Sequence, residues 1–136
     1  MFRVQIIFLL VASLAPQLQA IAIAEDKEPD PREKLETTID YGIGLIEKKK
    51  YRELIEDFCH PEDLKNLRRV EKVNDVVASL QGKKGIVLLD VLKNIKLKEP
   101  RYNSDKTKAT FPVDVEEAPQ EQIIFEKSEK YWYLRN

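Results

Sequence analysis

The spacing of apolar residues changes once along the chain, and this change limits the fold more than any other feature of the sequence. Before Ile95, apolar side chains recur every three or four residues, as on one face of an α-helix. Beyond it they alternate with polar ones, as in a strand with one buried face. Helices followed by antiparallel strands are typical of an α+β domain, so we expect N-terminal helices packed on one face of a curved antiparallel sheet.

The first helix is predicted to begin at Pro31. Asp30 suits the N-cap, Pro31 suits the first helical position, and Glu33 completes a capping box. A glycine inside a helix costs about 1 kcal/mol relative to alanine, so at its glycines the helix either bends or is closely packed by another element. We favour close packing. The predicted buried face consists of Leu35, Ile39, Ile43 and Ile46, with Gly42 and Gly44 in the same segment.

The next segments also show helical spacing. Three lysines at residues 48–50 mark the end of the first helix, where positive charge opposes the helix dipole. A second helix is expected from Tyr51 to Phe58, and His60-Pro61 stops it because proline disfavours helical geometry in the preceding residue. Residues 82–85 predict a turn, and the apolar segment 86–92 fits either a strand or a helix. Pro61-Glu62-Asp63 opens a further helical turn, and a third helix is expected over Val70, Val73, Val76, Val77 and Leu80.

Three strands are predicted in the last part of the chain. The first alternates Ala109, Phe111, Val113 and Val115 with polar residues, and Pro112 places it at a sheet edge or a bulge. Residues 122–126 and 131–135 form a hairpin joined by residues 127–130. On the final strand Trp132 and Leu134 share the core side. Tyr131 and Tyr133 share the other side, either as a contact surface for a partner or as a cross-strand aromatic pair.

The N-terminal residues predict export. A short segment with one positive charge at Arg3 precedes an uncharged apolar run, and Ala22-Ile23-Ala24 is a small-residue cleavage site followed at once by charged residues. Leu18-Gln19-Ala20 is a second cleavage option. The run is short for a membrane span and Pro16 interrupts it, so no stable span is expected after cleavage. We therefore predict a signal peptide at 1–24, a flexible charged leader at 25–30 and a single α+β domain at 31–136, located in the periplasm or outside the cell.

Composition excludes several classes of partner and site. Lys plus Arg number 23 against 24 for Asp plus Glu, so no basic excess exists to neutralise nucleic-acid phosphates. One Cys and one His are too few for a structural zinc site or an internal disulfide, and no metal or other cofactor is expected. Cys59 and His60 are neighbours in sequence, and neighbours seldom direct their side chains at one another, so we interpret them as structural rather than as nucleophile and base.

The predicted helices and the closing strands resemble the nuclear-transport-factor-2-like (cystatin-like cone) superfamily. The resemblance is carried by the amphipathic first helix, a Lys-Lys-Tyr51 turn, the sequence His60-Pro61-Glu62-Asp63-Leu64, and strands of the form Ile-Ile-Phe-Glu-Lys and Lys-Tyr-Trp-Tyr-Leu. It covers most of the chain after residue 24 and implies a cone of helices wrapped by a curved sheet, as in small exported members of uncharacterised function. Few residues lie between Leu92 and Lys106 for further strands.

Two functions follow from this resemblance. Enzymes of the superfamily, such as ketosteroid isomerase, use a carboxylate base and a Tyr or polar donor inside the cone. The acids at positions 40 and 114 fall off the apolar faces and are expected to be solvated, without the raised pKa of a general base. We therefore expect no catalytic residue but a binding or accessory domain for a small apolar ligand or protein partner; an isomerase or dehydratase, and a homodimer, stay open. The candidate pocket-lining residues are Tyr41, Phe58, Phe111 and Trp132.

Overall fold

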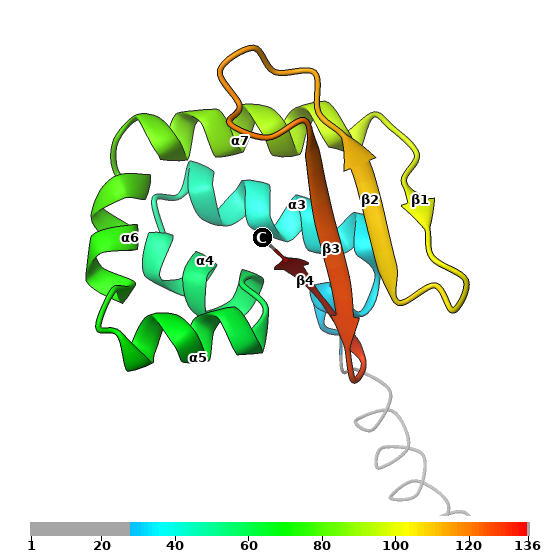
Figure 1. Ribbon diagram of the computed structural model, residues 1–136, viewed down its shortest axis with the longest axis horizontal. Helices are drawn as coiled ribbons and strands as arrows, with labels where there is room; N and C mark the ends of the chain where they lie inside the picture. Colours follow the sequence, from blue (N-terminus) through cyan, green and yellow to red (C-terminus); the bar gives the residue numbers. More distant parts are fainter. Residues whose placement is uncertain (1–27, 136) are drawn as a thin grey trace, which may run out of the picture. The chain divides into compact units, whose positions relative to one another are not determined.

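The computed structural model describes residues 28–135, and every helix and strand in this range lies from Pro31 onward (Figure 1). The predicted signal peptide and residues 25–27 of the leader lie outside the described residues; residues 28–30 adopt no helix or strand. The helical elements are a 3-10 turn η1 (Pro31–Glu33) and helices α3 (Leu35–Glu47), α4 (Tyr51–Phe58), α5 (Pro61–Arg69), α6 (Val73–Leu80) and α7 (Lys83–Lys96).

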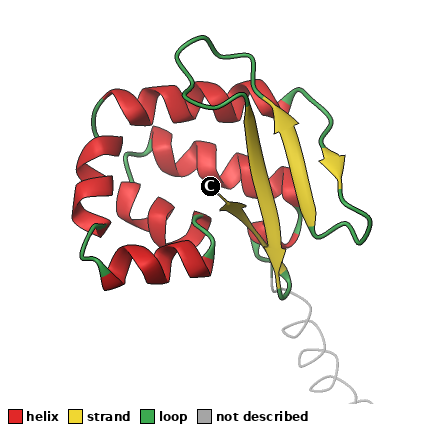
Figure 2. Cartoon of the chain, viewed as in Figure 1, coloured by secondary structure: helices red, strands yellow, loops and turns green. Residues whose placement is uncertain are grey.

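The strands follow the helices in sequence and form one antiparallel sheet in the order β1-β2-β3-β4 (Figure 2). Their bounds are β1 (Arg101–Tyr102), β2 (Lys108–Pro112), β3 (Gln122–Ser128) and β4 (Tyr131–Arg135). Each strand pairs with the next one in the chain, so short connections suffice. This arrangement confirms the predicted α+β class with a curved antiparallel sheet. The cone-like shape stays a prediction.

The start of the first helix differs from the prediction. Pro31 to Glu33 form a 3-10 turn, and α3 begins at Leu35 with Lys34 as N-cap, whose side chain makes no capping hydrogen bond. Thr38 supplies a different polar contact, because its hydroxyl donates to the Lys34 carbonyl at 2.7 Å. The predicted buried face is correct: Leu35, Ile39, Ile43 and Ile46 are all buried.

The lysines after α3 end this helix in a defined motif. Lys49 adopts a left-handed φ of 59°, and its amide donates to the Ile46 carbonyl. The Lys50 amide donates to the Leu45 carbonyl, so the two bonds form a Schellman motif that satisfies carbonyls at the helix end. The chain then turns into α4, as predicted.

The helices after Arg69 correct two predictions. Val70 caps α5 instead of opening the third helix, and α6 begins at Val73. The turn predicted at residues 82–85 is confirmed only at Gly82, because α7 already begins at Lys83 and takes in the ambiguous segment 86–92. Gly85 belongs to the first turn of this helix and is needed there for space: a Cβ would lie 1.9 Å from the Leu80 carbonyl oxygen. Glycine at position 85 therefore allows close contact with the end of α6 and does not mark a turn.

The strand β2 is shorter than expected. It ends at Pro112, and Val113 and Val115 lie half-buried in the loop that follows. Ala109 and Phe111 are buried, as the alternation predicts. The hairpin between β3 and β4 is present with a two-residue connection, Glu129-Lys130. One further strand, the two-residue β1, occupies the segment between Leu92 and Lys106.

Close packing between α3 and α4 depends on Gly42. A Cβ at this position would lie 2.7 Å from Cε2 of Phe58, whose side chain is 1% exposed. The Phe58 ring also meets Phe125 of β3 edge-to-face, with the ring centroids 5.7 Å apart. Gly42 thus lets one ring contact both a helix and the sheet, which confirms the close packing expected at this glycine.

Replacing the two glycines of α3 should have opposite effects on stability. Gly42→Ala forces the fixed Phe58 ring to move and should lower the free energy of unfolding by about 1–3 kcal/mol. Gly44→Ala meets no atom within 4 Å and should raise it by about 0.5–1 kcal/mol through helix propensity. Urea denaturation of the two variants measures both changes. A Gly42→Ala variant as stable as Gly44→Ala would contradict the packing described here.

Candidate functional site

A cavity of about 1010 Å³ lies among α4, α5, α6 and α7, the loop between β2 and β3, and residues of β3 and β4. In Figure 1 these four helices follow one another around one side of the fold. Ligand sites in proteins commonly enclose about 300–1,000 Å³ and are mainly apolar, so both the volume and the lining suit a small molecule. The aliphatic side chains of the lining are Leu54, Ile55, Leu67, Val70, Val76, Leu80, Val87, Leu88, Val91, Val113, Ala118, Ile123 and Leu134.

The cavity exists because α5 and α6 do not pack fully against the core. No residue of α6 is buried, and Leu64 is the one buried residue of α5. Val76 and Leu80 of α6 are half-buried at the cavity wall. Protein interiors are normally close-packed, so a cavity bordered by so many half-buried aliphatic side chains departs from ordinary packing.

The lining carries charges of both signs. Arg69, Lys83 and Lys84 are exposed cations, whereas Asp63 and Glu117 are the acids. Lys83 and Glu117 form an ion pair at 3.9 Å with both side chains largely exposed, a type of pair that contributes little stability. The other acid, Asp63, lies 4.0 Å from Nε of Arg135, which is not part of the lining.

One of the four predicted pocket-lining residues, Phe58, lies in the wall of this cavity. The other three have different surroundings. Trp132 is 6% exposed and Phe111 is 2% exposed, and both belong to the hydrophobic core between helices and sheet. Tyr41 is half-buried, and its hydroxyl donates to Oδ2 of Asp57 at 2.8 Å. Burial and this contact raise the pKa of Tyr41 to about 12.

Cys59 lies in the cavity wall at the end of α4. Burial, together with the negative charge of Asp63, raises the pKa of its thiol to about 11. The thiolate is the reactive form of cysteine, so a raised pKa makes this thiol a poor nucleophile at neutral pH. This supports the structural interpretation of Cys59.

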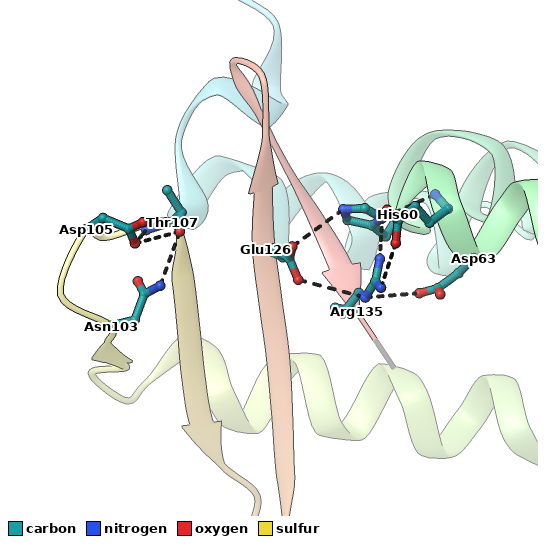
Figure 3. Close-up of polar contacts among 8 residues, drawn as sticks. His60, Asp63, Asn103, Asp105, Thr107, Glu126 and Arg135 are labelled. Carbon is teal, nitrogen blue, oxygen red and sulfur yellow. Dashed lines mark hydrogen bonds and ion pairs between the residues drawn. The ribbon is translucent and has the colours of Figure 1, made fainter.

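His60 belongs to a polar cluster at the edge of the sheet (Figure 3). Its Nδ1 lies 2.6 Å from Nη1 of Arg135 and accepts a hydrogen bond from the backbone amide of Glu62. Because an arginine can only donate, Nδ1 acts as acceptor, and the proton of the neutral ring lies on Nε2, which is 3.9 Å from Oε1 of Glu126. Arg135 also donates to Oε2 of Glu62 at 2.8 Å and lowers the pKa of that carboxyl.

Residues of the same segment attach the link between α4 and α5 to the edge strand β4. The His60 amide donates to the Leu134 carbonyl, and Cys59 forms an isolated bridge with Leu134. The His60 ring then meets Tyr133 edge-to-face on the side of the strand opposite Trp132. Thus the link between α4 and α5 covers an edge that would otherwise expose unpaired backbone groups.

The outer tyrosines are covered by a residue of the same chain. The Arg32 guanidinium of η1 lies 4.5 Å from the ring centroid of Tyr131 and 5.9 Å from that of Tyr133. Both tyrosines are half-buried. This cation–π contact is a third interpretation of the tyrosine pair, besides the partner surface and the cross-strand pair considered from the sequence.

The acids considered as possible bases lie at the surface, as expected. Asp40 pairs with Lys96 at 2.6 Å, and Asp114 pairs with Lys98 at 2.7 Å. Within residues 28–135, no group of three or more His, Cys, Asp or Glu side chains is arranged to hold a metal ion. Among these residues no helix combines the length and the apolar character needed to cross a bilayer.

Most cavity-lining residues were missed from the sequence. Asp63, Asn66 and Leu67 of α5, together with Val70 at its C-cap, follow the spacing of one helical face and all line the cavity. That spacing was available as a signal, but the same pattern occurs on any helix that packs against a core. Two of these residues, Asp63 and Asn66, are polar, so the spacing indicates a face of mixed polarity and does not show that the neighbouring elements leave space in front of it.

The thiol of Cys59 should react slowly with iodoacetamide at pH 8. Its pKa of about 11 against an ordinary 9.0 leaves about a hundredfold less thiolate than in an unfolded chain. The alkylation rate, followed by mass spectrometry, should keep rising about tenfold per pH unit up to pH 10. Urea-unfolded protein is the control, and its rate should level off at lower pH. A rate for folded protein that also levels off near pH 9 would contradict the buried, acid-flanked environment.

Comparison with protein-family models, curated proteins and solved structures finds no match to this chain.

Proposed function

We propose that this chain is an exported, non-catalytic domain that binds a small apolar ligand in the cavity among α4–α7. The observation that carries the proposal is a volume of about 1010 Å³ walled mainly by aliphatic side chains. Removing an apolar molecule from water into such a site is favourable in proportion to the apolar area buried. A protein partner and a homodimer are the alternatives for this surface.

The chemistry of the lining supports binding over catalysis. The one thiol at the cavity is a poor nucleophile because burial raises its pKa. His60, whose Nδ1 is engaged by Arg135 and the Glu62 amide, is not part of the lining. The alternative function, an isomerase or dehydratase of a cone-like fold, requires a base aimed at the ligand, whereas Asp40 and Asp114 pair with surface lysines. The acids of the lining also lie beside cations: Asp63 is 4.0 Å from Arg135, and Glu117 is 3.9 Å from Lys83.

Membership of the nuclear-transport-factor-2-like superfamily is part of the same proposal. It rests on the motifs between residues 48 and 64 and on the aromatic closing strand. The order of helices followed by an antiparallel sheet is consistent with it. A binding or accessory role, as in members of this superfamily that are not enzymes, agrees with the mainly aliphatic lining of the cavity.

A bulky side chain inside the cavity should weaken binding, and the same side chain outside should not. Val87 lines the cavity, whereas the adjacent Ile86 is 64% exposed and not part of the lining. Val87→Trp should lower the affinity for the neutral apolar dye Nile red about tenfold or more, and Ile86→Trp should leave it nearly unchanged. Fluorescence titration measures the affinities, and urea denaturation checks that both variants are folded. Equal affinities in two folded variants would overturn the proposed site.

Export is tested separately. The small-residue site at residues 22–24 and the charged residues that follow lead us to propose that the mature protein begins at Glu25. N-terminal sequencing of protein secreted by an expressing cell should read Glu25-Asp26-Lys27-Glu28. Recovery of chains that retain Met1, in a soluble cytosolic fraction only, would contradict export.

A further inference from the structure

The lining of the cavity combines two kinds of side chain. Leu67, Val76 and Leu88 contribute aliphatic surface from three different helices. Lys83 and Lys84 also line the cavity, although both are exposed residues at the beginning of α7. Lysine can lay its aliphatic stem along apolar surface and keep its ammonium group in water. The cavity therefore offers an apolar interior with positive charge where it meets solvent.

The charge of the lining differs from that of the whole chain. Basic residues number 23 and acidic residues 24 in the sequence, which gives a slight acidic excess. The lining instead has three cations, Arg69, Lys83 and Lys84, and two acids, Asp63 and Glu117. Asp63 lies 4.0 Å from Arg135, which is not part of the lining and also pairs with Glu62 and Glu126. Within the lining, Lys83 pairs with Glu117 at 3.9 Å. The lining itself thus carries one more cation than acids, an excess that complements a single anionic group.

We infer that the natural ligand is a free fatty acid, with its alkyl chain among the aliphatic side chains of α5, α6 and α7 and its carboxylate at Lys83 and Lys84. This inference rests on the proposed function. Each methylene group buried by the cavity should strengthen binding about fourfold. A ligand without charge would gain nothing from the two lysines, and a cationic ligand would be repelled by the excess positive charge.

The test compares two ligands with the same alkyl chain, dodecanoate and dodecanol. The alcohol is the less soluble in water, so a cavity that recognises only apolar surface binds the alcohol more tightly. Recognition of the carboxylate reverses this order. Both affinities are measured at pH 7.5 by displacement of Nile red from the purified protein, below the concentration at which dodecanoate forms micelles. We expect dodecanoate to bind at least about fivefold more tightly.

Variants identify the charges that produce this preference. The double variant Lys83→Gln, Lys84→Gln should bind dodecanol as before and lose most of the preference for dodecanoate. Lys93→Gln is the matched control, because Lys93 is an exposed lysine of the same helix that does not line the cavity. It should keep the preference. Adding salt should also reduce the preference, since exposed charges are screened.

The possible results separate this inference from the proposed function. Tighter binding of dodecanol would overturn the fatty-acid inference and leave the proposed apolar site intact. An unchanged preference in the double lysine variant would overturn the placement of the carboxylate. Tighter binding of a lysophospholipid than of dodecanoate would overturn the choice of a carboxylate head group. Failure of the folded protein to bind Nile red, dodecanol and dodecanoate would overturn the inference and the proposed function together.

Discussion

Phe58 packs against Gly42 of α3 and against Phe125 of β3, and so joins two helices to the sheet. The ring fits against α3 only because residue 42 has no side chain, and its edge-to-face contact with Phe125 fixes α4 against β3. The same ring forms part of the cavity wall. Phe58 is also the last residue of α4, so its position determines where the chain leaves the core. The direction of α5 and the existence of the cavity both depend on this exit.

The segment after Phe58 is held by polar contacts instead of apolar packing. His60 bonds to the Leu134 backbone, and Arg135 joins the His60 ring to Glu62. These contacts hold the beginning of α5 at the edge of the sheet, outside the hydrophobic core. From there α5 and α6 connect to α7 with few buried side chains, and the apolar faces of the three helices face a common space. The path of the chain after Phe58 therefore produces both the polar attachment at the sheet edge and the cavity among the helices.

The sequence predicts those parts of the fold that depend on local spacing. Leu35, Ile39, Ile43 and Ile46 follow one helical face, and Ala109 and Phe111 alternate in a strand, so their burial could be predicted. The apolar segment 86–92 could not be assigned, because it carries apolar residues in nearly every position and its helical state depends on neighbours. Glycine is common in turns, so Gly85 suggests a turn, but in the structure it allows a close contact with Leu80. Contacts between neighbouring elements decide such cases.

The candidate site was harder to predict for the same physical reason. Val76 and Leu88 have the spacing of core residues, and the sequence holds no sign that their helices stand apart from one another. Phe58 was the one predicted pocket residue found in the wall, and it belongs to both the core and the cavity, as do Leu54, Val91 and Ile123. Arg32, which covers Tyr131, is more than ninety positions away from it in sequence and could not be paired with it by any local rule.

Placing a ligand in the cavity tests the central claim most directly. Nuclear Overhauser effects from the alkyl chain of bound dodecanol should reach the methyl groups of Val76, Val87 and Leu88; effects confined to the exposed Ile86 and Leu97 would contradict it.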